Sequence, residues 1–149
     1  MRWLLVDRIE ECEAGRRAVG LKTFPRSDLL FLDHFPGLPT VPGVLQVEMI
    51  AQMAGKCLRA ERRGVLTLLA GVRSARFLRR VEPGQQCRIA VEITRKRDDF
   101  ALAAGTVSVG GARVCEAEIM FAFRPAPSAS ATDGGDELLV EMAAGGTAP

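Results

Sequence analysis

The chain has 149 residues, which suits one domain with a substantial core and is short for two. Hydrophobic residues make up 48% of the sequence and the formal net charge is +2, so the composition is that of a globular protein and does not call for a nucleic-acid partner. No apolar stretch approaches the roughly 20 residues of a membrane-spanning helix, and the apolar N-terminal part is too brief for a signal peptide. We therefore expect a cytoplasmic protein that binds neither membrane nor nucleic acid.

The four cysteines are scattered along the chain at Cys12, Cys57, Cys87 and Cys115. They form no CxxC pair and no cluster with the single histidine, although a zinc site needs closely spaced ligands. Disulfide frameworks are typical of shorter secreted chains that are dense in cysteine. We expect buried, reduced thiols and no metal site.

The first half of the chain predicts two strands and a long helix. Segments 2–12 and 16–24 look like a strand pair joined by a turn. Pro42 suits the first helical position, because its missing N–H costs nothing there, and Gly64 is a plausible stop. The helix between them is apolar on nearly every side in its first turns, Val44 included, so we expect it to be buried in the middle of the fold.

The segments that follow predict strands. Residues 66–80 form a long candidate strand, residues 86–94 alternate apolar and polar side chains, and segments 100–109 and 112–123 flank a Gly-Gly turn as a hairpin. One buried helix with roughly five or six antiparallel strands makes an α+β fold, in which the sheet wraps around the helix. We expect the folded domain to cover 1–124.

Composition changes abruptly after Phe123. Residues 125–149 are rich in Pro, Ala, Ser and Gly, and such a segment buries too little apolar surface to offset the entropy of ordering it. We expect a flexible C-terminal tail there.

Arginines gather in three places in the second half of the folded part. They are Arg59, Arg62 and Arg63; Arg73, Arg76, Arg79 and Arg80; and Arg95 and Arg97, with Lys96 between them. These groups fit either a solvated, arginine-rich surface or a docking surface for an acidic partner. The sequence leaves both readings open.

The stretch DHFPGLPTVPGVLQVEMIAQ, residues 33–52, contains the only histidine of the chain. His34 stands in a loop stiffened by prolines and glycines, just ahead of the helix. Free N–H groups at a helix N-terminus carry partial positive charge and stabilise negative charge that develops on an oxygen. An imidazole at this place suits proton abstraction next to a carbonyl group, although a lone histidine is commonly structural.

Glu48 lies inside the apolar turns of the same helix. A carboxylate there carries a large desolvation cost unless it is paired or protonated, so Glu48 is a candidate general acid. Gln52 follows at i+4 on the same face and is placed to orient the carboxyl group. The alternative is a structural glutamate paired with an arginine such as Arg76. A base at His34 and an acid at Glu48 together suit the loss of water from a β-hydroxy carbonyl compound.

The residues HFPGLPTVPGVLQVEMIAQ resemble the signature of the FabZ-type (3R)-hydroxyacyl-acyl-carrier-protein dehydratases, roughly HFPGxPxxPGVLxxEAxAQ. The histidine and the glutamate are equally far apart in both. The segments LLVDRIEECEAG, LAGVRSARFLRRVEPGQQ and VCEAEIMFAF also resemble regions of this family. The resemblance therefore covers about residues 3–123.

This resemblance implies a hot-dog fold and a homodimer at minimum, commonly a trimer of dimers, with each active site shared by two subunits. His34 would act on the α-proton and Glu48 on the β-hydroxyl group. The Gly43 backbone N–H would polarise the thioester carbonyl, and Gln52 would support Glu48. The substrate would arrive on the phosphopantetheine arm of acyl carrier protein, an acidic partner, and the resemblance implies no other cofactor.

The sequence departs from the family pattern at several places. Asp33 stands where a glycine usually precedes the histidine, Met49 replaces a small alanine, and the chain has no tyrosine. Acyl chain length and pathway are therefore left open. The alternatives are a dehydratase-isomerase, which typically has Asp at the place of Glu48, a hot-dog thioesterase, which lacks the HFPG histidine, and a non-catalytic subunit of a secondary-metabolite pathway.

Overall fold

A computed structural model describes residues 3–127 as one six-stranded sheet with a long helix packed against it. The elements in chain order are β1 (Arg8–Glu13), β2 (Arg17–Thr23), α1 (Leu30–Asp33), α2 (Gly43–Glu61), β3 (Val65–Phe77), β4 (Gln86–Lys96), β5 (Phe100–Val109) and β6 (Ala112–Pro125). The predicted α+β class is confirmed. The expected tail lies outside the described residues from 128 onward.

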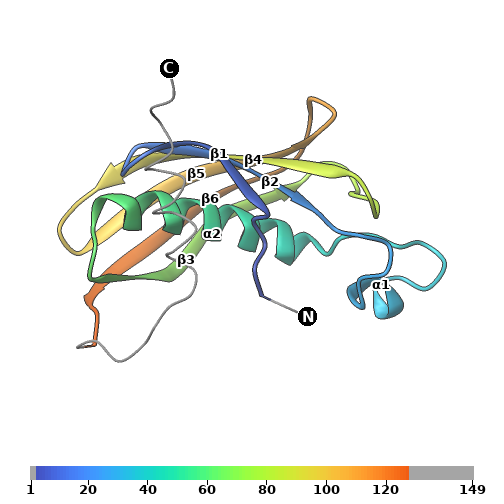
Figure 1. Cartoon of the computed structure of the whole chain (residues 1–149), viewed down its shortest axis with the longest axis horizontal. Coiled ribbons are helices and arrows are strands. Elements are labelled where there is room, and N and C mark those ends of the chain that lie inside the picture. The colour runs from blue at the N-terminus through green and yellow to red at the C-terminus, as the bar shows by residue number, and fades with distance from the viewer. Residues whose placement is uncertain (1–2, 128–149) are drawn as a thin grey trace, which may run out of the picture.

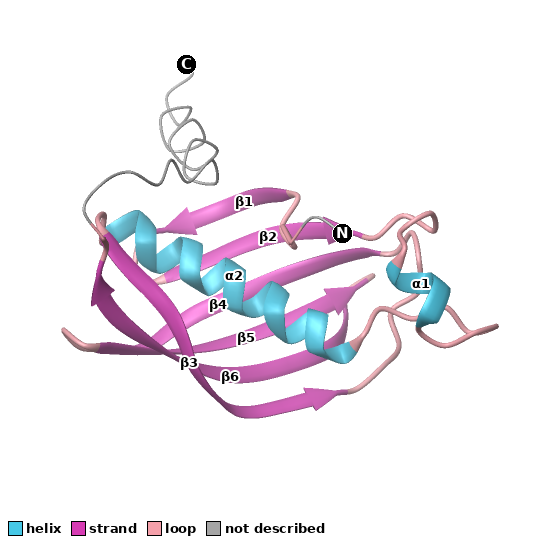
Figure 2. Cartoon of the chain, turned by 90° about the horizontal axis from the view of Figure 1, so that it is seen from below, coloured by secondary structure: helices cyan, strands magenta, loops and turns pink. Residues whose placement is uncertain are grey.

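The sheet is antiparallel throughout and has the order β1-β2-β4-β5-β6-β3. It curves around α2, which crosses one face of it (Figures 1 and 2). Along β5, every second residue from Ala101 to Val107 is buried on the face that the helix covers. Strands β1 and β3 form the two edges.

Helix α2 carries the centre of the hydrophobic core. Met49, Ile50, Met53 and Ala54 are all fully buried against the sheet. A Cβ atom at Gly105 of β5 would stand 2.2 Å from the Ile50 side chain, so the glycine is what allows the helix to approach this strand so closely.

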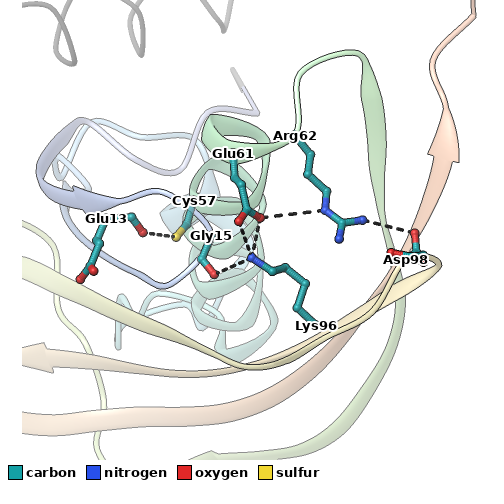
Figure 3. A network of polar contacts seen from close by, with 7 residues as sticks. All are labelled: Glu13, Gly15, Cys57, Glu61, Arg62, Lys96 and Asp98. Atoms are coloured by element: carbon teal, nitrogen blue, oxygen red, sulfur yellow. Dashed lines mark hydrogen bonds and ion pairs between the residues drawn. The ribbon is translucent and has the colours of Figure 1, made fainter.

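The C-terminal end of α2 is held by polar contacts with two turns of the sheet (Figure 3). Lys96 binds both carboxylate oxygens of Glu61 and the Gly15 carbonyl oxygen, and Arg62 donates to the Asp98 carbonyl oxygen at 3.3 Å. Exposed pairs of this kind add little stability individually. Together they fix the orientation of α2, and therefore the direction in which its N-terminal end points.

Three local predictions are corrected by the structure. Pro42 is the N-cap, with ψ 138°, and the first helical residue is Gly43. Val44 is 72% exposed, since it faces away from the sheet. The first strand begins at Arg8, because the backbone ahead of it bonds to α2 instead: the Leu5 N–H donates to Gln52 Oε1 at 2.8 Å.

All four cysteines are free thiols, and three of them are buried as predicted. Burial raises the pKa of Cys87 and Cys115 to about 11. Cys12 is exposed, so the prediction is wrong for that residue. Residues 3–127 include no helix with both the length and the apolar character needed to cross a membrane. Within the same range, no cluster of three or more His, Cys, Asp or Glu side chains is arranged to hold a metal ion.

Candidate active site

His34 directly follows the short helix α1 and opens the loop that leads to α2. Its backbone is extended, with φ −116° and ψ 101°, and its half-buried ring lies 4.4 Å from the Phe35 ring, centroid to centroid. The imidazole nitrogens make no hydrogen bond within residues 3–127, so both are available to a substrate or a second chain. Phe35 and Leu38 of the same loop are exposed.

The N-terminus of α2 begins at Gly43, whose N–H has no acceptor among the described residues. The Pro42 carbonyl oxygen accepts the first hydrogen bond of the helix, from the Leu45 N–H at 3.1 Å. The Phe77 ring lies directly against Gly43, and a Cβ atom there would stand 2.9 Å from ring carbon Cε1. A free backbone donor is therefore presented beside an aromatic wall, where the helix dipole favours negative charge.

Glu48 is half-buried on α2, and its partners are neutral hydrogen-bond donors. Gln52 Nε2 donates to Glu48 Oε1 at 3.0 Å, and the Trp3 indole Nε1 donates to the same oxygen at 3.2 Å. Arg76, the alternative partner, instead pairs with Glu116 of the neighbouring strand at 3.3 Å. Within residues 3–127 the carboxyl group is thus held by neutral donors and has no cationic partner.

One chain does not bring all the predicted site residues together. Gly43, Glu48 and Gln52 share α2, whereas His34 belongs to the preceding loop, and no hydrogen bond joins His34 to Glu48 within the described part of the chain. Sequence reasoning missed Trp3. Its contact spans 45 positions, and the signal available was the single tryptophan of the chain, standing just before an apolar segment.

One long helix wrapped by an antiparallel sheet is the hot-dog arrangement that the motif predicted. A model of the FabA-like domain matches residues 1–118, and the chain belongs to this family.

Within the family, the chain is similar to curated FabZ dehydratases, as its motif predicted. It is 44% identical over 128 residues to the 3-hydroxyacyl-acyl-carrier-protein dehydratase FabZ of Geobacillus thermodenitrificans, covering 85% of this chain and 88% of that protein. It is also 44% identical over 125 residues to the FabZ of Bacillus pumilus, covering 83% and 87% of the two chains.

Solved structures confirm the predicted hot-dog fold. The dehydratase heterocomplex ApeI:P from Xenorhabdus doucetiae matches with a TM-score of 0.61 and 16% identity, over 78% of this chain and 96% of that one. A hypothetical thioesterase with coenzyme A from Streptococcus pneumoniae matches with a TM-score of 0.65 and 16% identity, over 81% and 90%. At this identity the likeness shows the fold alone.

Proposed function

We propose that this protein converts (3R)-hydroxyacyl thioesters carried on acyl carrier protein into trans-2-enoyl thioesters, in fatty-acid or related polyketide-type biosynthesis. The curated relatives carry the name of this activity. The observation that carries the proposal is the placement of a hydrogen-bonded carboxyl group, Glu48, on the helix whose N-terminus presents the free Gly43 N–H.

The proposed reaction needs a base, an acid and a donor to the thioester oxygen. His34 takes the α-proton, and the electron pair of that C–H bond moves toward the thioester carbonyl. The Gly43 N–H stabilises the negative charge that develops on this oxygen. The electron pair then returns to form the Cα=Cβ double bond while Glu48 protonates the β-hydroxyl group, so the C–O bond breaks and water leaves. No electrons are exchanged with a further molecule, so the proposal includes no cofactor besides the phosphopantetheine arm of the carrier.

The complete site in this proposal uses two copies of the chain. Strand β3 has 13 residues and forms one edge of the sheet, and its side chains Leu66, Leu68, Leu69, Val72 and Phe77 are exposed. A long apolar edge strand is a template for pairing with another chain. One chain does not join His34 to Glu48. In a homodimer formed along β3, alone or within a trimer of dimers, the site would combine His34 of one subunit with Glu48 of the other.

Two exposed arginines, one on β3 and one just after it, support docking of an acidic carrier protein. Arg73 lies on β3, and Arg79 follows the strand two residues after Phe77, the ring that touches Gly43. Both are exposed and form no ion pair within the described residues. Their free positive charge attracts an acidic partner toward the end of the helix where the thioester would react. The free thiols agree with a reducing, cytoplasmic setting for this enzyme.

The experiment that tests the proposal measures dehydration and hydration of carrier-bound acyl thioesters over a series of chain lengths. His34→Ala and Glu48→Gln are each expected to lower kcat/KM at least about a hundredfold, as loss of a general base or acid does. Glu118→Gln is the matched control, because Glu118 is exposed on β6 and has no polar partner in the described range. Full activity in His34→Ala or in Glu48→Gln would contradict the role given to that residue.

The same assay separates the alternatives. Release of free thiol would identify a thioesterase, and a cis-3-enoyl product would identify a dehydratase-isomerase. Inactivity on every chain length with tight carrier binding would indicate a non-catalytic subunit.

A further inference from the structure

The N-terminal segment and α2 are joined by a closed set of hydrogen bonds around the Glu48 carboxyl group. Leu5 N–H donates to Gln52 Oε1 at 2.8 Å, and Gln52 Nε2 donates both to the Trp3 carbonyl oxygen at 3.1 Å and to Glu48 Oε1 at 3.0 Å. The Trp3 indole Nε1 then donates to Glu48 Oε1 at 3.2 Å. Residues 3–5 are therefore part of the wall around Glu48.

This arrangement distinguishes the two oxygens of the carboxyl group. The orientation of the Gln52 amide is set by the Leu5 N–H, which requires an acceptor, so the Gln52 NH₂ group must face Glu48. Oε1 thus receives hydrogen bonds from two N–H groups, and its lone pairs are occupied. When the carboxyl group is protonated, the proton must therefore reside on Oε2.

We propose that Trp3 is a positioning residue for Glu48: its indole N–H, together with the Gln52 amide, holds Oε1 as a permanent acceptor and leaves Oε2 as the oxygen that exchanges a proton with the substrate. The inference rests on the proposed function for its catalytic consequence. The N–H group carries the effect, because the Trp3 side chain is otherwise largely open to solvent at 62% exposure. Fixing the donor oxygen removes rotations that would carry the proton away from the β-hydroxyl group.

Trp3 also supplies a probe of the contact, because it is the only tryptophan of the chain. We expect its emission to respond when the carboxyl group bound to its N–H gains or loses a proton. Within the described residues the polar partners of Glu48 are the neutral side chains of Trp3 and Gln52. Asp7, the nearest carboxylate along the N-terminal segment, has partners of its own, because it accepts hydrogen bonds from Lys22 and from the Thr23 N–H. A pH-dependent change in emission is therefore expected to follow Glu48.

The spectroscopic test titrates the tryptophan emission of the full-length protein without substrate. We expect one step in the wild-type protein, no such step in Glu48→Gln, and an unchanged step in His34→Ala. An unchanged step in Glu48→Gln would overturn the proposed contact. This result does not depend on turnover, so it is independent of whether the protein is a dehydratase.

The kinetic test compares Trp3→Phe, which keeps an aromatic ring and removes the N–H, with the wild type. Loss of one hydrogen bond to a carboxyl group is expected to lower kcat of dehydration roughly three- to tenfold and leave KM within about twofold. A kcat equal to that of the wild type, or a loss carried by KM instead of kcat, would overturn the positioning role in an active enzyme. Absence of any dehydration by the wild type would overturn the proposed function and, with it, the catalytic half of this inference.

Discussion

The Phe77 ring at the end of β3 packs directly on the Gly43 backbone at the start of α2. A Cβ atom at residue 43 would meet ring carbons Cε1, Cδ1 and Cζ at 2.9, 3.0 and 3.1 Å. These separations are shorter than normal contact between carbon atoms, so the ring has to move if residue 43 carries a side chain. The position of the free Gly43 N–H is thereby coupled to the edge strand through which we expect the dimer to form.

Gly43→Ala is predicted to displace the Phe77 ring, lowering kcat/KM and reducing the free energy of unfolding by about 1–3 kcal/mol. Gly55→Ala is the matched control, because Gly55 lies in the same helix and no atom of residues 3–127 stands within 4 Å of its Cβ position, apart from the helix's own neighbouring residues. That change should stabilise the protein by roughly 0.5–1 kcal/mol. Urea unfolding of both variants checks the prediction, and equal stability of the two would contradict it.

Arg79→Glu is predicted to raise KM for a carrier-bound substrate roughly five- to tenfold, because it reverses a charge near the proposed docking site. The same substrate on coenzyme A should be affected much less. Arg97→Glu is the control, because Arg97 lies in the β4–β5 turn, at the opposite end of α2 from the proposed docking site. Asp98 of the same turn accepts a hydrogen bond from Arg62 at that end of the helix. Steady-state kinetics of both variants at low and high salt check the prediction. An equal effect of the two substitutions on KM would argue against docking near Arg79.

Gln46→Leu is predicted to stabilise the protein by about 1 kcal/mol. Gln46 is only 2% exposed, and its Nε2 reaches the Val41 carbonyl oxygen at a long 3.5 Å. Its Oε1 has no hydrogen-bond partner among the described residues. A leucine of similar size removes the cost of that buried oxygen. Thermal unfolding checks this, with Gln86→Leu at an exposed position as the control. A lower melting temperature for Gln46→Leu would show that the amide has a partner which the isolated chain lacks.

Cys12 is predicted to be the reactive thiol of the protein. Interaction with the neighbouring Cys57 thiol lowers the pKa of Cys12 to about 7, whereas the pKa of the buried Cys57, whose thiol donates to the Glu13 carbonyl oxygen at 3.4 Å, is raised. Since the thiolate is the reactive form, the rate of iodoacetamide labelling at Cys12 should rise with pH, reach half its maximum near pH 7 and level off above it.

Cys57→Ala removes the thiol that lowers the pKa of Cys12 and should move the midpoint of Cys12 labelling to higher pH. Mass spectrometry of labelled peptides measures both proteins. Faster labelling of Cys87 or Cys115 than of Cys12 at neutral pH would contradict the prediction.

Local signals were sufficient to predict most elements of this fold. The alternation in residues 86–94 and the hairpin at residues 110–111 each depend on neighbouring residues only, and the structure has strands there. The helix was predicted from its proline start and glycine stop, and its bounds differ by a residue or two. The four-residue helix α1 was missed because so short an element has no periodicity to detect.

The parts of the site that could not be predicted depend on contacts between distant segments. Trp3 reaches Glu48 across 45 positions, and Arg76 pairs with Glu116 because of the register between β3 and β6. Exposure of Val44 could not be read from periodicity either, since a helix apolar on all sides offers no polar face to mark its outer side. Motif similarity identified the candidate residues, and the structure showed which contacts hold their side chains in place.

Mixing two inactive variants decides whether an active site combines His34 of one chain with Glu48 of another. His34→Ala and Glu48→Gln are unfolded together, refolded at equal amounts, and assayed for dehydration of a carrier-bound hydroxyacyl thioester. In a mixed dimer, Glu48 of the first variant meets His34 of the second, so one of the two sites is intact. Random pairing predicts recovery of about one quarter of the wild-type activity. Recovery no greater than that of the variants refolded separately would contradict the shared site.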